Sequence, residues 1–223
     1  MRLTALVLSL ACALSLFCQQ NPDWKRLEDG NKAFLGTYIT LDQLNIRRGE
    51  LANGQNPPIT VLSCSDSRVP PELVFRQTLG QVFLVRSAGN VTDTLGIASI
   101  EYAIKKKWTK LLVILAHDKC GAVEEAMRAN GDPLPQGSVP LPPIKSGDDR
   151  NLAALVEQIK KSFSGRCPDA GGCWTFRTRQ NAFYTIDNLK IRSPIIAEAI
   201  KKGLPVAVAY YTLDGRAVVW KAP

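Results

Sequence analysis

Histidine is nearly absent from this chain, since its 223 residues include only one, His117. Histidine is the commonest metal-binding side chain in proteins and the one that most readily transfers protons near neutral pH. A single imidazole can serve only one of these roles. A metal site on this chain must therefore draw its other ligands from cysteines or carboxylates. If His117 is a ligand, an imidazole proton shuttle is excluded.

Aromatic residues are scarce as well, at 7% of the chain, whereas 28 basic residues outnumber 20 acidic ones and give a formal net charge of +8. Basic clusters at residues 105–107 and 201–202 have the character of helix ends, where cations complement the helix dipole. Nucleic-acid binding would call for a basic stripe interleaved with aromatic residues, and the sequence has none. We expect no nucleic-acid partner, and attribute to the charge only an attraction for small anions.

Long apolar runs are also lacking, apart from the uncharged and mostly apolar residues 3–17 that follow Met1 and Arg2. This run is short for a membrane span and suits the apolar region of a signal peptide. We expect a leader over residues 1–20 and a single domain over residues 21–223. The expected location is secreted or periplasmic, with no stable membrane span after leader removal. The alternative is a protein anchored in the membrane by an uncleaved leader.

Cysteine is the residue type that compensates for the missing histidines. Two of the six cysteines lie in the leader, and two others, Cys64 and Cys120, follow apolar segments. The last two, Cys167 and Cys173, flank the sequence Pro-Asp-Ala-Gly-Gly, which predicts a flexible turn able to close a small disulfide loop. An exported protein would keep such a bond in an oxidising compartment. Two free thiols on a loop are the alternative.

Apolar segments rich in β-branched residues alternate with helical patterns along the chain. Strands are predicted at residues 59–63, 81–87, 111–116, 205–212 and 216–220. Helices are predicted at residues 23–34, 41–52, 92–107, 121–130, 151–163 and within 179–202, with a short one starting near residue 70. This alternation indicates an α/β fold with a mainly parallel sheet, flanking helices and an antiparallel edge strand.

Two further expectations concern the segments between the strands. Residues 132–149 are rich in proline and glycine and predict a loop insertion. The helix over residues 92–107 is expected to bury its apolar side chains, which are Leu95, Ile97, Ile100, Tyr102 and Ile104.

Three candidate metal ligands follow two of the predicted strands. Cys64 comes directly after the strand at residues 59–63, and His117 and Cys120 follow the strand at residues 111–116. In sheets of this kind, ligands bind outside the carboxyl ends of the strands. Two thiolates and one imidazole leave the fourth position of a zinc ion open, as in catalytic rather than structural sites. We therefore expect one zinc ion per chain.

Asp66 and Arg68 lie two and four residues beyond the first candidate ligand. A surface ion pair of little energetic value is one interpretation. Beside a metal, the guanidinium would instead orient the carboxylate and keep it out of the open position. Released from Arg68, Asp66 could become the fourth ligand and close the site.

The motifs around these residues carry a resemblance. Cys-Ser-Asp-Ser-Arg-Val-Pro-Pro-Glu at residues 64–72, followed by His-Asp-Lys-Cys-Gly-Ala-Val at residues 117–123, resembles the β-class carbonic anhydrases. The likeness extends over residues 24–220. It includes Gly-Asn-Lys-Ala-Phe at residues 30–34 and Arg-Ser-Ala-Gly-Asn at residues 86–90. It implies a zinc lyase that reversibly hydrates carbon dioxide to bicarbonate and a proton.

The resemblance also implies roles for individual residues. The zinc ligands would be Cys64, His117 and Cys120, with Asp66 as alternative fourth ligand and Arg68 as its partner. Similarity to the plant-type branch implies a substrate pocket completed across the interface of a homodimer or higher homo-oligomer. The implied pocket residues are Gln55, Phe83, Tyr102 and Gly121.

Other functions remain open at this point. A thiol hydrolase would use Cys64 or Cys120 as nucleophile and His117 as base. A zinc-stabilised module without activity, and a hydrolase of carbon disulfide or carbonyl sulfide on the same scaffold, are further alternatives. In a carbonic anhydrase with one histidine, the proton has to leave through Asp66, Tyr102, ordered water or external buffer.

Overall fold

The structure, a computed structural model, describes residues 21–34, 41–135, 138 and 149–220. Within these residues the chain forms a five-stranded sheet in the order β2-β1-β3-β4-β5. The strands are β1 (Ile59–Ser63), β2 (Val82–Arg86), β3 (Leu111–His117), β4 (Val206–Tyr211) and β5 (Ala217–Trp220). The first four run parallel, and β5 pairs antiparallel with β4. The predicted fold class is confirmed.

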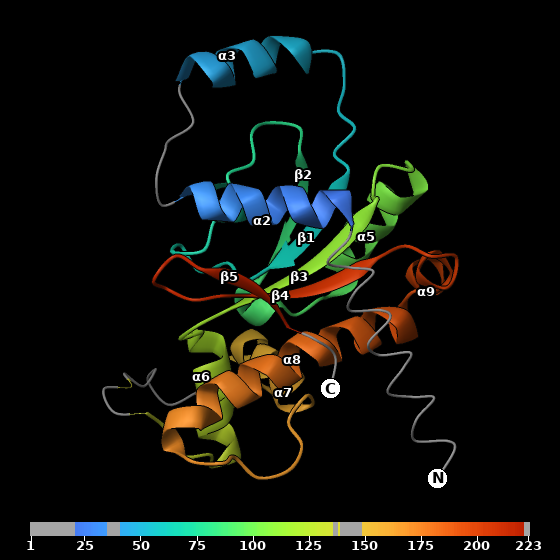
Figure 1. The fold of residues 1–223 in the computed structure, drawn as a ribbon. Coiled ribbons are helices and arrows are strands. Elements are labelled where there is room, and N and C mark those ends of the chain that lie inside the picture. The colour runs from blue at the N-terminus through green and yellow to red at the C-terminus, as the bar shows by residue number, and fades with distance from the viewer. Residues whose placement is uncertain (1–20, 35–40, 136–137, 139–148, 221–223) are drawn as a thin grey trace, which may run out of the picture.

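Helices cover both faces of this sheet (Figure 1). α2 packs on one face, and α5, α8 and α9 pack on the other. The helices are α2 (Pro22–Phe34), α3 (Leu41–Glu50), α4 (Pro71–Val74), α5 (Thr94–Lys105), α6 (Gly121–Asn130), α7 (Arg150–Lys160), α8 (Ala170–Arg192) and α9 (Pro194–Lys201), with a 3-10 turn η1 at Ala88–Asn90.

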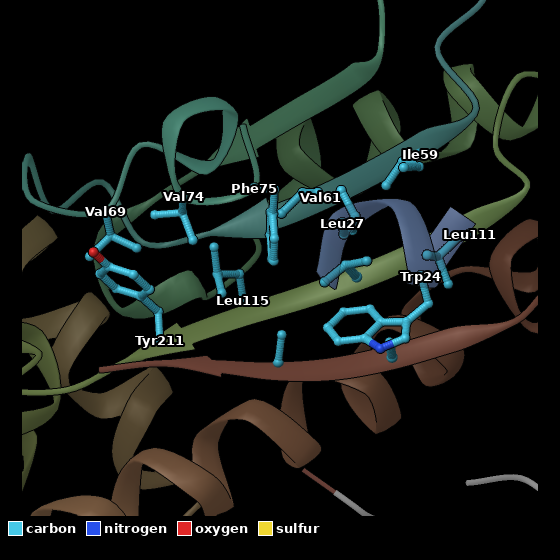
Figure 2. Close-up of a cluster of buried hydrophobic side chains, with 13 residues drawn as sticks. Trp24, Leu27, Ile59, Val61, Val69, Val74, Phe75, Leu111, Leu115 and Tyr211 are labelled. Atoms are coloured by element: carbon cyan, nitrogen blue, oxygen red, sulfur yellow. The ribbon is translucent and has the colours of Figure 1, made fainter. Parts of the chain in front are cut away.

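The central strands are apolar because helices cover them on both sides. Every residue of β1 and β3 is buried, as expected of strands inside a parallel sheet. Figure 2 shows the core on the α2 side, where Trp24 and Leu27 meet strand residues such as Val61 and Leu115. Trp24 also packs edge-on against Phe75, with ring centroids 6.3 Å apart.

The prediction for the buried face of α5 was wrong at two positions. Ile97 and Ile100 are buried, but Leu95 is 75% exposed and Tyr102 is 49% exposed. Residues 95 and 102 are seven apart and share one side of the helix, whereas residues 97, 100 and 104 share another. The sheet covers only the second side. The exposed Tyr102 ring lies 6.3 Å from that of Phe83 on the edge strand β2.

The start of α8 also differs from the prediction. The Ala-Gly-Gly part of the expected flexible turn is the first turn of this helix, which places Cys173 inside α8. The carboxylate of Asp169 accepts a hydrogen bond of 2.7 Å from the Gly172 amide and so caps the helix. The paired glycines masked this start. Farther along, the expected single helical stretch is divided at Ser193, ahead of Pro194.

Some predicted segments lie outside the described residues. These are the leader at residues 1–20 and residues 136–137 and 139–148 of the predicted loop. In the part of the chain that is described, no helix has the length and apolar character to cross a membrane.

A buried asparagine, Asn31, joins α2 to the β4–β5 hairpin at one edge of the sheet. The Asn31 amide donates to the carbonyls of Val74 (2.7 Å) and Gly215 (3.1 Å), and its oxygen accepts from the Ala217 amide (2.8 Å). The preceding Gly30 permits this approach, because a Cβ there would lie 1.8 Å from the carbonyl oxygen of Phe75. Asn31 therefore connects α2, α4 and the β4–β5 hairpin.

Replacing Asn31 by alanine should lower the free energy of unfolding by about 2–4 kcal/mol, because it leaves buried backbone groups without partners. Urea unfolding followed by circular dichroism measures this change. The neighbouring Lys32→Ala is the control: it removes only an exposed ion pair with Glu28, and should change stability by less than about 0.5 kcal/mol. Equal losses of unfolding free energy in the two variants would contradict a stabilising role for the Asn31 hydrogen bonds.

Candidate metal centre

Parallel pairing of β1 with β3 brings the three candidate ligands together. The register pairs Ser63 with Leu115, so Cys64 follows β1 beside the point where β3 ends at His117. Cys120 occupies the N-cap position of α6, three residues farther on. The ligands thus come from the carboxyl ends of two adjacent strands.

The three side chains converge on one buried point. The ligand atoms of Cys64, His117 and Cys120 all lie within 4.8 Å of one another, and the two sulfur atoms are 3.9 Å apart. The residues are 4%, 0% and 1% exposed. A second cluster, of Asp132 with Cys167 and Cys173, offers no thiolates because these two cysteines are joined in a disulfide.

The imidazole of His117 is oriented for a metal ligand. Its Nδ1 lies 2.7 Å from the carbonyl oxygen of Asp118, so Nδ1 carries the hydrogen and donates it. Its Nε2 is then an acceptor, and it is buried with no hydrogen-bond partner. A buried polar atom without a partner is costly. An unpaired nitrogen beside two thiols fits a zinc ion, which takes nitrogen and sulfur ligands.

A hydrogen bond between the thiols of Cys64 and Cys120 shifts their two pKa values in opposite directions. A hydrogen bond from the Cys120 thiol lowers the pKa of Cys64 well below its usual range. The same interaction raises the pKa of Cys120 well above its usual range, and burial raises it further. The Gly89 amide also donates to the Cys64 sulfur over 3.3 Å. A divalent cation between the sulfurs would allow both to be thiolates.

Asp66 and Arg68 form the ion pair expected beside the ligands. Arg68 donates from Nε to one carboxylate oxygen (2.9 Å) and from Nη2 to the other (2.7 Å). This pairing holds the pKa of Asp66 at about 2. Arg68 Nη2 also donates to the carbonyl of Lys119 (3.1 Å), in the turn between His117 and Cys120. Asp66 Oδ2 lies 3.9 Å from His117 Nε2, close to the centre but engaged by Arg68.

Two side chains that were not predicted as site residues hold the segment around Cys64. Arg86 donates to the carbonyls of Cys64 (3.0 Å) and Asp66 (2.8 Å). Asn181, 1% exposed on α8, donates over 2.7 Å to the carbonyl of Gly89. The Arg86 turn was visible as a motif. The role of Asn181 follows from helix packing and left no local signal.

The predicted pocket residues fall into two groups. Gly121 follows Cys120 as the first residue of α6, and a Cβ there would have no atom within 4 Å. Phe83 instead pairs with Thr60 near the start of β1, four residues and on the order of 13 Å from Cys64 at the strand rise. Tyr102 packs against Phe83.

Gln55 is exposed and precedes β1 by four residues. It therefore lies beyond the amino end of the strand whose carboxyl end leads to Cys64. Within one chain, the structure does not bring Gln55, Phe83 or Tyr102 to the three ligands.

The family of the chain follows from comparison with known proteins. A family model described as carbonic anhydrase matches residues 59–218, which include all the candidate ligands. The chain belongs to the carbonic anhydrase family. A carbonic anhydrase of Mycolicibacterium smegmatis is 37% identical over 197 residues, which cover 86% of this chain and 89% of that protein.

Solved structures of β-class carbonic anhydrases have the same fold. The β-carbonic anhydrase CcaA superposes with a TM-score of 0.63 at 20% identity, over 88% of this chain and 94% of that chain. One of two tetrameric β-carbonic anhydrases of the fungus Sordaria macrospora gives a TM-score of 0.56 at 22% identity, over 100% and 98% of the two chains. The resemblance to the β class is confirmed.

Zinc content tests the ligand set directly. The purified chain should contain about one zinc ion, and Cys64→Ser should weaken zinc binding by more than about 100-fold, beyond the loss caused by removing an outer-shell partner. Elemental analysis and competition with a chromophoric chelator measure both quantities. Ser67→Ala, an exposed change in the same loop, should leave both unchanged. A Cys64→Ser variant with full zinc content would rule Cys64 out as a ligand.

Proposed function

We propose that this chain catalyses the reversible hydration of carbon dioxide to bicarbonate and a proton, at one zinc ion held by Cys64, His117 and Cys120. The observation that carries the proposal is the buried Nε2 of His117, which has no hydrogen-bond partner and lies beside two thiols. In a member of the carbonic anhydrase family, this donor set has a specific use. Three ligands leave one position of a tetrahedral ion open for chemistry.

A zinc ion bound here supplies the Lewis acidity that makes water a nucleophile at moderate pH. The chain's own groups organise the reactants around it. Asp66 is held as an anion by Arg68, so its carboxylate can only accept hydrogen bonds and orients a donor such as water.

Asp66 also gives the site a way to close. Its Oδ2 is 3.9 Å from the ring nitrogen of His117 that faces the thiols. Loss of the two hydrogen bonds from the Arg68 guanidinium would free Oδ2 to take the open position, while the Arg68 amide still donates to Oδ1. Arg68 is therefore proposed to keep the site in its open form.

We further propose that a second copy of the chain completes the substrate pocket. Phe83 and Tyr102 pack together near the amino ends of β1 and β2, where Tyr102 is 49% exposed, and Gln55 precedes β1 by four residues. A homodimer that places this edge against the metal centre of its partner would supply an apolar wall and an amide. The tetrameric state named for the Sordaria macrospora protein supports a homo-oligomer.

The location of the protein is proposed from two features. Residues 1–20 have the composition of a leader, and Cys167 and Cys173 form a disulfide in the structure. A disulfide persists in oxidising compartments. We propose a secreted or periplasmic domain over residues 21–223, with membrane anchoring through an uncleaved leader as the alternative.

A stopped-flow hydration assay tests the proposed reaction. The zinc-loaded chain should accelerate carbon dioxide hydration, and its turnover should rise severalfold with buffer concentration. The reason is that His117 is the sole imidazole and both of its ring nitrogens are committed, so proton release depends on an outside acceptor. Cys64→Ser should abolish the activity together with zinc binding. Absence of hydration by a zinc-loaded chain would refute the proposal, and turnover independent of buffer would refute the proton route.

Mixing two inactive variants tests the shared pocket. Gln55→Ala lacks the proposed amide, and Cys64→Ser lacks the metal site. In a mixed dimer, one pocket combines the intact metal site of the first chain with the intact Gln55 of the second. Random assembly of a two-fold symmetric dimer should then restore about one quarter of wild-type activity.

A mixture of Cys64→Ser with Cys120→Ser, prepared in the same way, is the matched control for this experiment. Both variants damage the metal site of their own chain, so no mixed dimer contains an intact pocket. Recovery in the first mixture and none in the second is the expected result. If Gln55 served the metal site of its own chain, neither mixture would recover activity.

A further inference from the structure

The backbone of Cys120 is bonded to a side chain from a distant helix. The indole Nε1 of Trp174, in α8, donates a hydrogen bond of 3.2 Å to the carbonyl oxygen of Cys120. The same oxygen accepts the first hydrogen bond of α6, from the Glu124 amide, over 3.0 Å. Trp174 thus restrains the peptide from which the Cys120 thiol projects.

Trp174 lies at a helix start that is weak by itself. The first residues of α8 are Ala-Gly-Gly, and glycine is the poorest helix former after proline. A helix start of this composition frays unless other contacts hold it. The Asp169 cap holds the first turn, and the position of Trp174 depends also on the contacts that surround it.

Anchors lie on both sides of Trp174. The disulfide joins the preceding Cys173 to Cys167 in the segment before the helix. Three residues after Trp174, the buried Arg177 donates to both carboxylate oxygens of Asp132, each over 2.8 Å. Arg177 also donates to the carbonyl of Ser164 over 3.0 Å. These contacts tie the start of α8 to the end of α6 and to the segment that follows α7.

The same face of α8 reaches the other thiol. Asn181 lies seven residues after Trp174, which is about two helical turns. It donates to the carbonyl of Gly89, whose amide donates to the Cys64 sulfur. One helix therefore contacts the backbone that holds each sulfur, and Trp174 serves the Cys120 side.

We propose that Trp174 is a positioning residue for the Cys120 ligand, and that the Cys167–Cys173 disulfide holds Trp174 in place. The proposal rests on the proposed function in one respect, namely that Cys120 binds zinc. It assigns the disulfide a role in the metal geometry in addition to any role in the stability of the domain. Trp174 itself touches neither metal nor substrate.

The test replaces the indole by a ring that cannot donate. Trp174→Phe keeps most of the packing and should bind zinc about tenfold more weakly, the lower end of the effect of outer-shell partners. In the cobalt-substituted full chain, the thiolate-to-cobalt charge-transfer and ligand-field bands should shift, because they report the geometry around the sulfurs. Trp24→Phe is the matched control, since Trp24 lies in the core on the opposite face of the sheet. It should lower thermal stability without changing the cobalt spectrum.

A double-mutant cycle separates the disulfide's effect on the metal from its effect on stability. Cys167→Ala/Cys173→Ala should also shift the cobalt spectrum and weaken zinc binding. Added to Trp174→Phe, it should change neither quantity further, because the disulfide acts on the metal through Trp174. Its effect on melting temperature should remain in both backgrounds.

Each result decides one question. A wild-type chain that fails to bind one zinc or cobalt ion overturns the proposed function. A wild-type chain that binds the ion, together with a Trp174→Phe variant of unchanged affinity and spectrum, overturns only the positioning role. Equal spectral shifts in Trp24→Phe and Trp174→Phe would reduce that role to general packing. Additive effects of the disulfide and Trp174 on the spectrum would refute their connection.

Discussion

The parallel pairing of β1 with β3 is the contact on which the site depends. The two strands run side by side with a fixed register and are buried along their whole length. Because their carboxyl ends coincide, Cys64 and His117 meet without any further folding of the loops. Burial removes water from the two thiols and from the imidazole, so these groups contact one another. A metal site assembled in this way has the rigidity of the sheet behind it.

The irregular segments around the candidate metal centre are held by one type of hydrogen bond. A polar side chain donates to backbone carbonyls that no helix or strand satisfies. Arg86 does this for the segment after β1, Asn181 for the 3-10 turn, and Arg68 for the turn before Cys120. Asn31 does the same at the opposite edge of the sheet. Such bonds satisfy buried carbonyls and define the loop geometry at the same time.

The sequence was sufficient to predict the sheet and the convergence of Cys64, His117 and Cys120. Cys64, His117 and Cys120 stand next to apolar segments whose length and composition are typical of buried strands, so their position could be inferred from local pattern. Asp66 and Arg68 could be inferred because they share the first motif. Each of these residues lies within a few positions of a predicted strand end, and parallel strands bring such ends together at one edge of the sheet.

The features that escaped prediction depend on packing between distant elements. The exposure of Leu95 and Tyr102 is decided by which side of α5 the sheet covers, and an apolar helix pattern with two sides does not reveal this. The capped start of α8 was hidden by its glycines. The contacts of Trp174 and Asn181 join residues 54 and 92 positions apart. No local signal encodes contacts over such separations.

The placement of Gln55 and Cys64 at opposite ends of the same strand has a consequence for how the protein works in its surroundings. If each pocket needs Gln55 from one chain and the metal site of another, a single chain cannot form a complete pocket. Activity then depends on the protein concentration, because the chains associate at high concentration and separate on dilution. The stability of the association between chains would then set the lowest protein concentration at which the enzyme still acts.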